Sequence, residues 1–461
     1  MGNKLVKDMT TGSPMKHILG FSVPLLFGFL FQQFYNLVDT MIVGRSLGVE
    51  ALGAVGSTGA INFLILGFCM GVSNGFSIPM AQCFGAKDYK GMRCVMMNAV
   101  YISIVFTAVL TVLTVVFCMP ILKLMKTPSD IIGDAYSYIV IIFMGIPVAF
   151  LYNLVSGFIR SMGESKVPVY YLVLASFINI GLDLLFILVF HMGVAGAALA
   201  TVISQLISGV GCLAFMIKKY DFLRTSREER KFRSKYALKL CGVGIPMGLQ
   251  YSITAIGSIV LQSSVNMLGS LSVSAMATAN KVGMFFCCPF DAMGSTMATY
   301  GGQNVGAGKI ERLSKGLKAV SVLGIGYSVL AFVVLLFSRK FLVGLFVGSN
   351  APELVIELAA RVMLFSRSFY IPLAFVNIIR FLIQGMGASN LAVVAGVCEM
   401  VARAGVGFFL VPKFGFTAAC IASPVAWILA DIFLFPAYFY VLRKLRKAVA
   451  FSELPLTSTH S

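Results

Sequence analysis

The chain has 461 residues, of which 58% are hydrophobic and 12% are charged, and its formal net charge is +18. A typical soluble domain has roughly 25% charged residues, so the composition excludes an ordinary soluble globular protein. Apolar runs of about 20 residues recur along the chain, and each is long enough to cross the ~30 Å hydrocarbon layer as a helix. The short alternating segments of transmembrane barrels are not found. The sequence therefore predicts an all-α polytopic membrane protein.

Twelve membrane spans are predicted in chain order from hydropathy and helix-breaking residues. Their approximate limits are 15–43, 51–80, 95–119, 135–158, 167–190, 194–217, 238–265, 280–303, 316–337, 355–383, 389–411 and 417–441. The apolar run that follows the basic N-terminus is too long for a cleaved signal peptide. Residues 1–14 are therefore expected to be an N-terminal tail, and residues 447–461 a C-terminal tail.

Lysine and arginine are distributed unevenly between the two sides of the predicted membrane protein. The side of the N-terminus carries 25 of them, and the opposite side carries six. Because these residues are enriched in cytoplasmic loops, both termini are expected to be cytoplasmic, with the protein in the plasma membrane. The positive charges are scattered over short loops, which argues against a nucleic-acid surface.

Cysteine and glycine patterns give no sign of a metal site or an enzyme. The ten cysteines lie in or beside apolar spans without any C-x-x-C pair, so we expect neither disulfides nor a zinc site. Residues 71–75 match G-x-S-x-G, but a hydrolase elbow needs a strand, a turn and a helix. Gly67, Gly71 and Gly75 instead share one helix face, which predicts close packing of helices. No catalytic activity and no cofactor are expected.

The chain contains two copies of a six-helix unit. Val23-Pro24 returns as Ile245-Pro246, and QCFGAKD from Gln82 returns as QNVGAGK from Gln303. Three further pairs recur in the same order at nearly the same offset: IPVAF and IPLAF, RSMGESK and QGMGASN, MGVAGAALAT and FGFTAACIAS. Because six is even, both copies should enter the membrane from the same face and be related by a pseudo-twofold axis along its normal.

Two lobes follow from this repeat. The N-lobe is expected at 15–217, the C-lobe at 238–446, and a basic cytoplasmic linker at 218–237 joins them. Transporters built in this way bind their substrates between the repeats, and rocking of one bundle against the other gives alternating access. One chain can form the whole pathway, so a monomer is expected.

Polar residues within the N-lobe spans predict a cation site. Asn36 precedes Asp39 by three residues and Asn179 precedes Asp183 by four, so each pair shares a helix face. The proposed cation-coupling set is Asp39, Asn179, Asp183, Thr201, Asn36 and Asn153. These oxygens could bind Na⁺, or the two carboxyls could hold protons. The alternative is that each aspartate only joins helices through hydrogen bonds.

The C-lobe has different chemistry. Its counterpart of the first span has no acid, so the ion chemistry is expected in the N-lobe. Glu399 and Arg403 are spaced to pair on one helix. We expect an internal salt bridge there, and the alternative is a secondary C-lobe site at these two residues. In the first span, Pro24 is expected to act as a hinge because proline interrupts helical hydrogen bonding.

These motifs together resemble the multidrug and toxic compound extrusion (MATE) family. The resemblance lies in VP…Q…YNLVDT..VG of the first span, Q..GA at the ends of the second and eighth spans, and N…D of the fifth. It covers nearly the whole chain. It implies a secondary antiporter of twelve helices and two lobes. Such an antiporter exports amphipathic, often cationic organic compounds in exchange for H⁺ or Na⁺.

The pattern is similar to the DinF-like prokaryotic branch of that family. The N-lobe site of this branch falls on Asp39, Asn179, Asp183 and Thr201, and Asn153 matches an associated asparagine. The NorM-like branch carries an acid in the seventh span, which this sequence lacks. Two other functions remain open: a lipid-linked oligosaccharide flippase of the same superfamily, and a membrane receptor or assembly protein that transports nothing.

Overall fold

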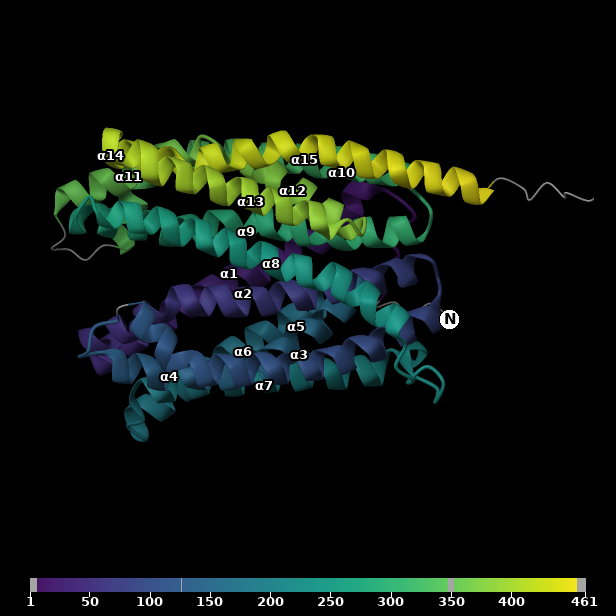
Figure 1. Ribbon diagram of the computed structural model, residues 1–461, viewed down its shortest axis with the longest axis horizontal. Coiled ribbons are helices and arrows are strands. Elements are labelled where there is room, and N and C mark those ends of the chain that lie inside the picture. Colours follow the sequence, from purple (N-terminus) through teal and green to yellow (C-terminus); the bar gives the residue numbers. More distant parts are fainter. Residues whose placement is uncertain (1–5, 126, 347–351, 454–461) are drawn as a thin grey trace, which may run out of the picture.

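The computed structural model describes residues 6–125, 127–346 and 352–453, so residues 1–5 and 454–461 of the predicted tails lie outside the described residues. Long helices run side by side along the longest axis of the molecule (Figure 1). The first half of the chain lies on one side and the second half on the other. The N-terminal end of α1 and the C-terminal end of α15 lie at the same end of the bundle, as an even number of spans requires.

The described part of the chain has ten helices that are long and apolar enough to cross a membrane, and two bent helix pairs bring the number of spans to twelve. The first half contains α1 (Pro14–Leu47), α2 (Val49–Gly85), α3 (Tyr89–Leu124), α4 (Ile132–Met144), α5 (Ile146–Ser161), α6 (Lys166–Leu184), η1 (Leu185–Val189) and α7 (Gly193–Lys219). After η2 (Asp221–Leu223), the second half contains α8 (Ser234–Asn266), α9 (Ser270–Gly306), α10 (Glu311–Phe346), α11 (Glu353–Arg367), α12 (Tyr370–Gly385), α13 (Ser389–Gly405), η3 (Val406–Leu410), α14 (Val411–Phe414) and α15 (Phe416–Glu453). The predicted all-α fold with twelve spans is confirmed. Most helices extend past the predicted limits, because hydropathy marks only their apolar part.

Both repeats break their fourth span at the same place. The axes of α4 and α5 differ by 45°, and those of α11 and α12 by 55°. Pro147 is the second residue of α5, and Pro372 is the third residue of α12. Because proline has no N–H to continue the hydrogen bonding of the preceding turn, the repeated IPVAF and IPLAF motifs each place a bend within one span.

The glycine stripe of α2 packs against α8. A Cβ atom on Gly71 would lie 2.5 Å from the carbonyl oxygen of Met247, and one on Gly75 would lie 2.5 Å from the Cα of Gly244. Only glycine allows two helices to approach this closely. The predicted close packing is therefore confirmed, and its partner is a helix of the other half.

The described residues form two large hydrophobic cores and a small cluster of Ile78, Val243 and Met247, and α1 contributes to both large cores. The start of α1 places Ile18, Phe21 and Leu25 in the core built mainly by α9 to α15. The end of α1 places Val43 in the core built mainly by α2 to α7. Any motion of one half against the other must therefore shift or bend α1.

The basic linker between α7 and α8 is folded against α3. The guanidinium of Arg93 donates hydrogen bonds of 2.9 and 2.7 Å to the carboxylate of Glu229, which also accepts one of 2.9 Å from the N–H of Ser226. Asn98 accepts a hydrogen bond of 2.8 Å from the N–H of Arg233. The hydrogen bonds from Arg93 and Ser226 lower the pKa of Glu229 to about 2. The carboxylate thus stays ionised at physiological pH.

Replacing Glu229 by Gln should release the linker. Hydrogen bonds to charged groups contribute roughly 1.5–3 kcal/mol each, so amide exchange of residues 221–233 should become at least about tenfold faster. Hydrogen–deuterium exchange of the purified protein measures this.

The pH dependence of the linker follows from the lowered pKa of Glu229. The stabilisation is fully present above the pKa of the unfolded state and is lost as pH falls through the folded value of about 2. The protection of the linker amides from hydrogen exchange, expressed relative to the intrinsic exchange rate, should therefore be the same at pH 7 and pH 5. The exposed neighbour Glu228→Gln is the matched control, and equal exchange in the two variants would contradict the role of Glu229.

Candidate functional site

Asp39 of α1 and Asp183 of α6 face each other within the first half. Their carboxyl groups lie within hydrogen-bonding reach of one another, and Asp183 is fully buried. None of the ion pairs among the described residues involves either of them. Two ionised carboxylates this close repel each other, and a shared proton or a bound cation would relieve that repulsion.

Asn179 joins this pair to α7. In the amide orientation that satisfies both ends, its Nδ2 donates to Asp183 Oδ2 at 3.0 Å and its Oδ1 accepts from the N–H of Thr201 at 3.1 Å. The hydroxyl of Thr201 donates to the carbonyl of Ala197 at 3.1 Å. The structure thus brings Asp39, Asn179, Asp183 and Thr201 together from three helices.

Three other residues of the predicted site lie outside this cluster. Asn153 is half-buried, and its amide donates to the carbonyl of Ala149 at 2.8 Å. Asn36 is exposed. Within the described ranges, neither amide has a hydrogen bond to the aspartate pair. Pro24 lies within α1, which continues as helix on both sides of it.

Two tyrosines next to the acids were not predicted. The hydroxyl of Tyr35 reaches the Thr201 side chain, and Tyr138 of α4 lies close enough to interact electrostatically with both aspartates. Tyr35 precedes Asp39 by four residues, so helical spacing alone would have found it. Tyr138 is far from both acids in sequence, and no local pattern indicates it.

The cluster has the oxygen ligands that a small hard cation needs. The Oδ1 atoms of Asp39 and Asp183 are buried and have no hydrogen-bond partner among the described residues. Carboxylate, amide and hydroxyl oxygens suit hard cations, and the same pair of carboxyls can share a proton. The described residues contain no group of three or more His, Cys, Asp or Glu that could hold a metal ion. The donor set of the cluster suits a proton or a small hard cation.

The second half contains a buried charge network around Glu399. Its carboxylate accepts a hydrogen bond of 2.7 Å from Arg380 and one of 2.9 Å from Arg403. The expected Glu399–Arg403 salt bridge is therefore present, and Arg380 of α12 is an additional partner. Asp431 of α15 lies near enough to interact electrostatically with Arg380 and Glu399. Two arginines thus lie among two acids, an arrangement that suits a structural network.

Replacing Glu399 by Gln should destabilise the second half. Removal of one partner from a buried ion pair typically costs about 3–5 kcal/mol, because Arg380 and Arg403 would lose their counter-charge. Denaturant or thermal unfolding of the purified protein measures this cost. Glu357→Gln removes an exposed ion pair with Lys340 and should cost less than about 1 kcal/mol. A stable Glu399→Gln protein with altered ion dependence of transport would instead identify a coupling site.

A reciprocal contact between α2 and α9 holds the two halves together at one end. A Cβ atom on Gly85 would collide with the carbonyl oxygen of Gln303, and one on Gly306 would collide with the carbonyl oxygen of Gln82. These residues are the two Q..GA motifs of the repeat. The motif therefore specifies a backbone contact between the repeats.

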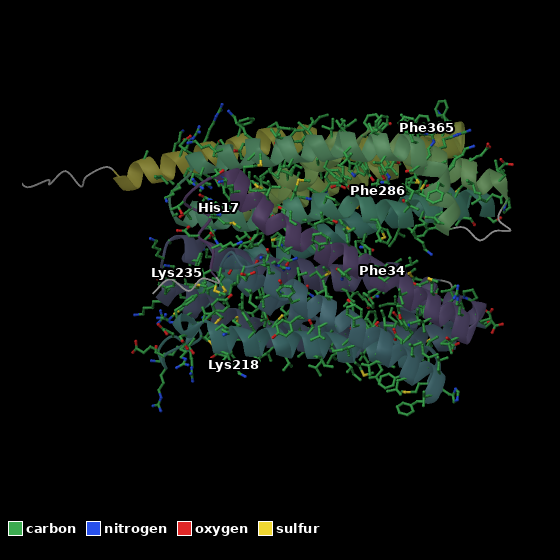
Figure 2. The ribbon with its side chains drawn as sticks, turned by 180° about the vertical axis from the view of Figure 1, so that it is seen from behind. His17, Phe34, Lys218, Lys235, Phe286 and Phe365 are labelled. Carbon is green, nitrogen blue, oxygen red and sulfur yellow. The ribbon has the colours of Figure 1, made fainter. Side chains whose placement is uncertain are left out.

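The segment before α1 covers the same end of the molecule. The N–H of Lys7 donates to the carbonyl of Met162 at 3.3 Å, and the N–H of Met9 donates to the Gln303 side chain at 2.9 Å. Gln303 in turn donates to the carbonyl of Ser161 at 2.8 Å. Figure 2 shows Lys218 and Lys235 at this same end, which is also the end of His17 near the start of α1. The basic end of the molecule is therefore sealed by contacts between the halves.

Replacing Gly306 by Ala should weaken this seal. Overpacking a close contact typically costs about 1–3 kcal/mol, and here the obstacle is backbone that cannot rotate away. Amides 82–86 and 303–307 should exchange about tenfold faster in hydrogen–deuterium exchange. Gly326→Ala on α10 is the control, since a Cβ there meets no atom within 4 Å. Unchanged exchange in Gly306→Ala would show that the contact does not hold the seal.

Twelve spans in two repeated halves, with paired acids in one half and a seal between the halves at one end, define a membrane transporter. The MatE family model matches residues 24–185 and 246–409, one match in each half. The chain therefore belongs to the MatE family, and it is a multi-pass transporter rather than an enzyme, as the sequence predicted.

Comparison with individual known proteins supports the assignment to this family. The chain is 31% identical to the probable multidrug resistance protein YoeA of Bacillus subtilis, over 70% of this chain and 71% of that protein. It is 34% identical to the probable multidrug resistance protein YpnP of the same species, over 66% and 68%. Its fold matches a solved outward-facing multidrug resistance MATE transporter of the MOP superfamily with a TM-score of 0.89, at 22% identity, over 97% of this chain and all of that one.

Proposed function

We propose that this protein is a secondary active antiporter of the DinF-like branch that exports amphipathic, often cationic organic compounds in exchange for H⁺ or Na⁺. The observation that carries the proposal is the contact between the half-buried Asp39 and the buried Asp183, because two adjacent carboxylates favour capture of a cation. The relatives named as multidrug resistance proteins support the substrate class. The branch is supported by the position of the acids, because α8 has none in its apolar part.

Exchange follows from competition for one negative charge. With the acids free of H⁺ and Na⁺, the N-lobe attracts a cationic compound. Capture of H⁺ or Na⁺ neutralises the pair, so the compound loses affinity and leaves. Transport then requires that each ligand prefer a different state of the protein.

The change is transmitted through α1. This helix carries Asp39 near one end, while its other end packs in the core of the second half. Ser22 and Thr296 share a hydrogen bond of 2.7 Å between α1 and α9. Pro24 lies two residues beyond Ser22 and is the proposed hinge, because proline weakens the helix locally. Asn36 and Asn153 are proposed to complete the ligand set when α1 repacks.

The orientation of the protein in the membrane follows from the end of the bundle that carries most of the lysine and arginine. We place both termini and the 218–237 linker in the cytoplasm of the cell, because that end carries most of the lysine and arginine. The seal between α2 and α9 then closes the cytoplasmic side, so the described state faces outward. The N-lobe at 15–217 and the C-lobe at 238–446 are proposed to rock against each other, and one chain supplies the whole pathway.

Replacing Asp39 by Asn should abolish coupling. The protein is reconstituted into liposomes, and ethidium movement is followed under a pH gradient and, separately, a Na⁺ gradient. The native protein should move the dye under one of these gradients, which identifies the coupling ion. The variant should be at least about tenfold slower, equivalent to 1.4 kcal/mol.

The control for this assay is Asp130→Asn, an exposed acid between α3 and α4, which should behave like the native protein. Native rates in Asp39→Asn would refute the proposed role of the pair. If lipid-linked oligosaccharide moves and the dye does not, the flippase function replaces the antiporter.

A further inference from the structure

A groove of about 820 Å³ lies on the first half, between α3 and α7. These helices are on the side of the first half that faces away from the second half (Figure 1). Phe150 and Leu154 of α5 form its floor, and Ile104 of α3 and Ile217 of α7 line its sides. Both isoleucines are 61% exposed. The groove is therefore open to the surroundings of the helices, which in a membrane protein are lipid chains.

The groove changes from apolar to basic at the end of the molecule where the linker lies. There the linker after α7 closes it with Arg224, Thr225 and Arg230. Thr225 holds the guanidinium of Arg230 through hydrogen bonds of 2.9 Å to its hydroxyl and 3.3 Å to its carbonyl. Arg224 is exposed and pairs with Asp221 at 2.9 Å. The end of the groove thus presents two guanidinium groups and one carboxylate.

The linker that carries these arginines is fixed in place. Glu229 anchors it to Arg93 of α3 through two hydrogen bonds, and the hydroxyl of Tyr101 donates to the carbonyl of Arg230 at 2.7 Å. The distance from apolar groove to basic end is therefore set by the fold. A pair of guanidinium groups on an anchored linker, next to an apolar channel, matches a molecule with a phosphate at one end and hydrocarbon at the other.

We propose that this groove binds a membrane glycerophospholipid with an anionic headgroup. Its acyl chain lies along α5 between α3 and α7, and its phosphate lies between Arg224 and Arg230. Anionic lipids are present in the cytoplasmic leaflet, where basic residues at the ends of membrane helices attract them. The bound lipid would join α3, α7 and the linker, the segment that connects the two halves. This site is separate from the Asp39 cluster and does not depend on the proposed transport cycle.

Lipid binding to the full-length protein tests the proposal. The purified protein in a non-ionic detergent is titrated with phosphatidylglycerol or phosphatidylcholine of identical chains, and bound lipid is counted by native mass spectrometry. Phosphatidylglycerol should bind at least about tenfold more tightly, because both lipids carry a phosphate but only phosphatidylcholine has a quaternary ammonium that cancels its charge and is repelled by the two arginines. The double substitution Arg224→Gln and Arg230→Gln should reduce this preference to less than about twofold.

A matched double variant separates a site from general attraction by positive charge. Arg227→Gln with Lys231→Gln removes the same charge from exposed positions of the same linker that do not line the groove. This control variant should keep the full preference for phosphatidylglycerol over phosphatidylcholine. Equal losses in the two double variants, or equal binding of the two lipids by the native protein, would overturn the proposal.

Blocking the groove gives a second, independent readout. Ile217→Trp places a bulky ring at an exposed position of the groove wall, so it should reduce phosphatidylglycerol binding without lowering the unfolding temperature. Native lipid binding in this variant would overturn the proposed position of the acyl chain. Displacement of the lipid by ethidium at low concentration would also overturn it, because the groove would then be a drug site.

Discussion

The backbone contact between α2 and α9 constrains the rest of the structure. At Gly85 and Gly306 each helix lies directly against a glutamine carbonyl of the other, and no side chain fits between them. The segment before α1 and the Gln303 side chain add hydrogen bonds over the same place. All of these contacts join one half to the other. They must separate together if the basic end of the molecule is to open.

A single helix connects this seal to the acidic cluster. The start of α1 packs with the second half, and its end brings Asp39 to Asp183 in the first half. Electrostatics and packing therefore act on the same element. In the proposed cycle, a change of one charge at Asp39 alters how the end of α1 packs on α6, and α1, bending at Pro24, carries that change toward α9. The Glu399 network joins α12 to α13 through Arg380 and Arg403, so it holds the second half together without an ion pair to α1 among the described residues.

Local patterns in the sequence predict what lies within one helix or one repeat. Hydropathy predicted the twelve spans, and the spacing of Gly67, Gly71 and Gly75 predicted that α2 packs closely against another helix. Helical spacing predicts that Asn179 and Asp183 share a face, but it says nothing about partners on other helices. The positions of Tyr138 near the acids and of Arg380 beside Glu399 could therefore not be predicted from the sequence. The fold of the linker could not be predicted for the same reason, because Glu229 and Arg93 are 136 residues apart.

The reciprocity of the α2–α9 contact bears on the origin of the chain. Gly85 meets Gln303, and Gly306 meets Gln82, so equivalent residues exchange places across the pseudo-twofold axis. This is the geometry of an isologous interface, in which two identical subunits use the same surface. It implies an ancestor of six helices that assembled as a parallel homodimer through its Q..GA motif. Two copies within one chain can change separately, and here the first half holds the Asp39–Asp183 pair while the second half holds the ion-paired Glu399.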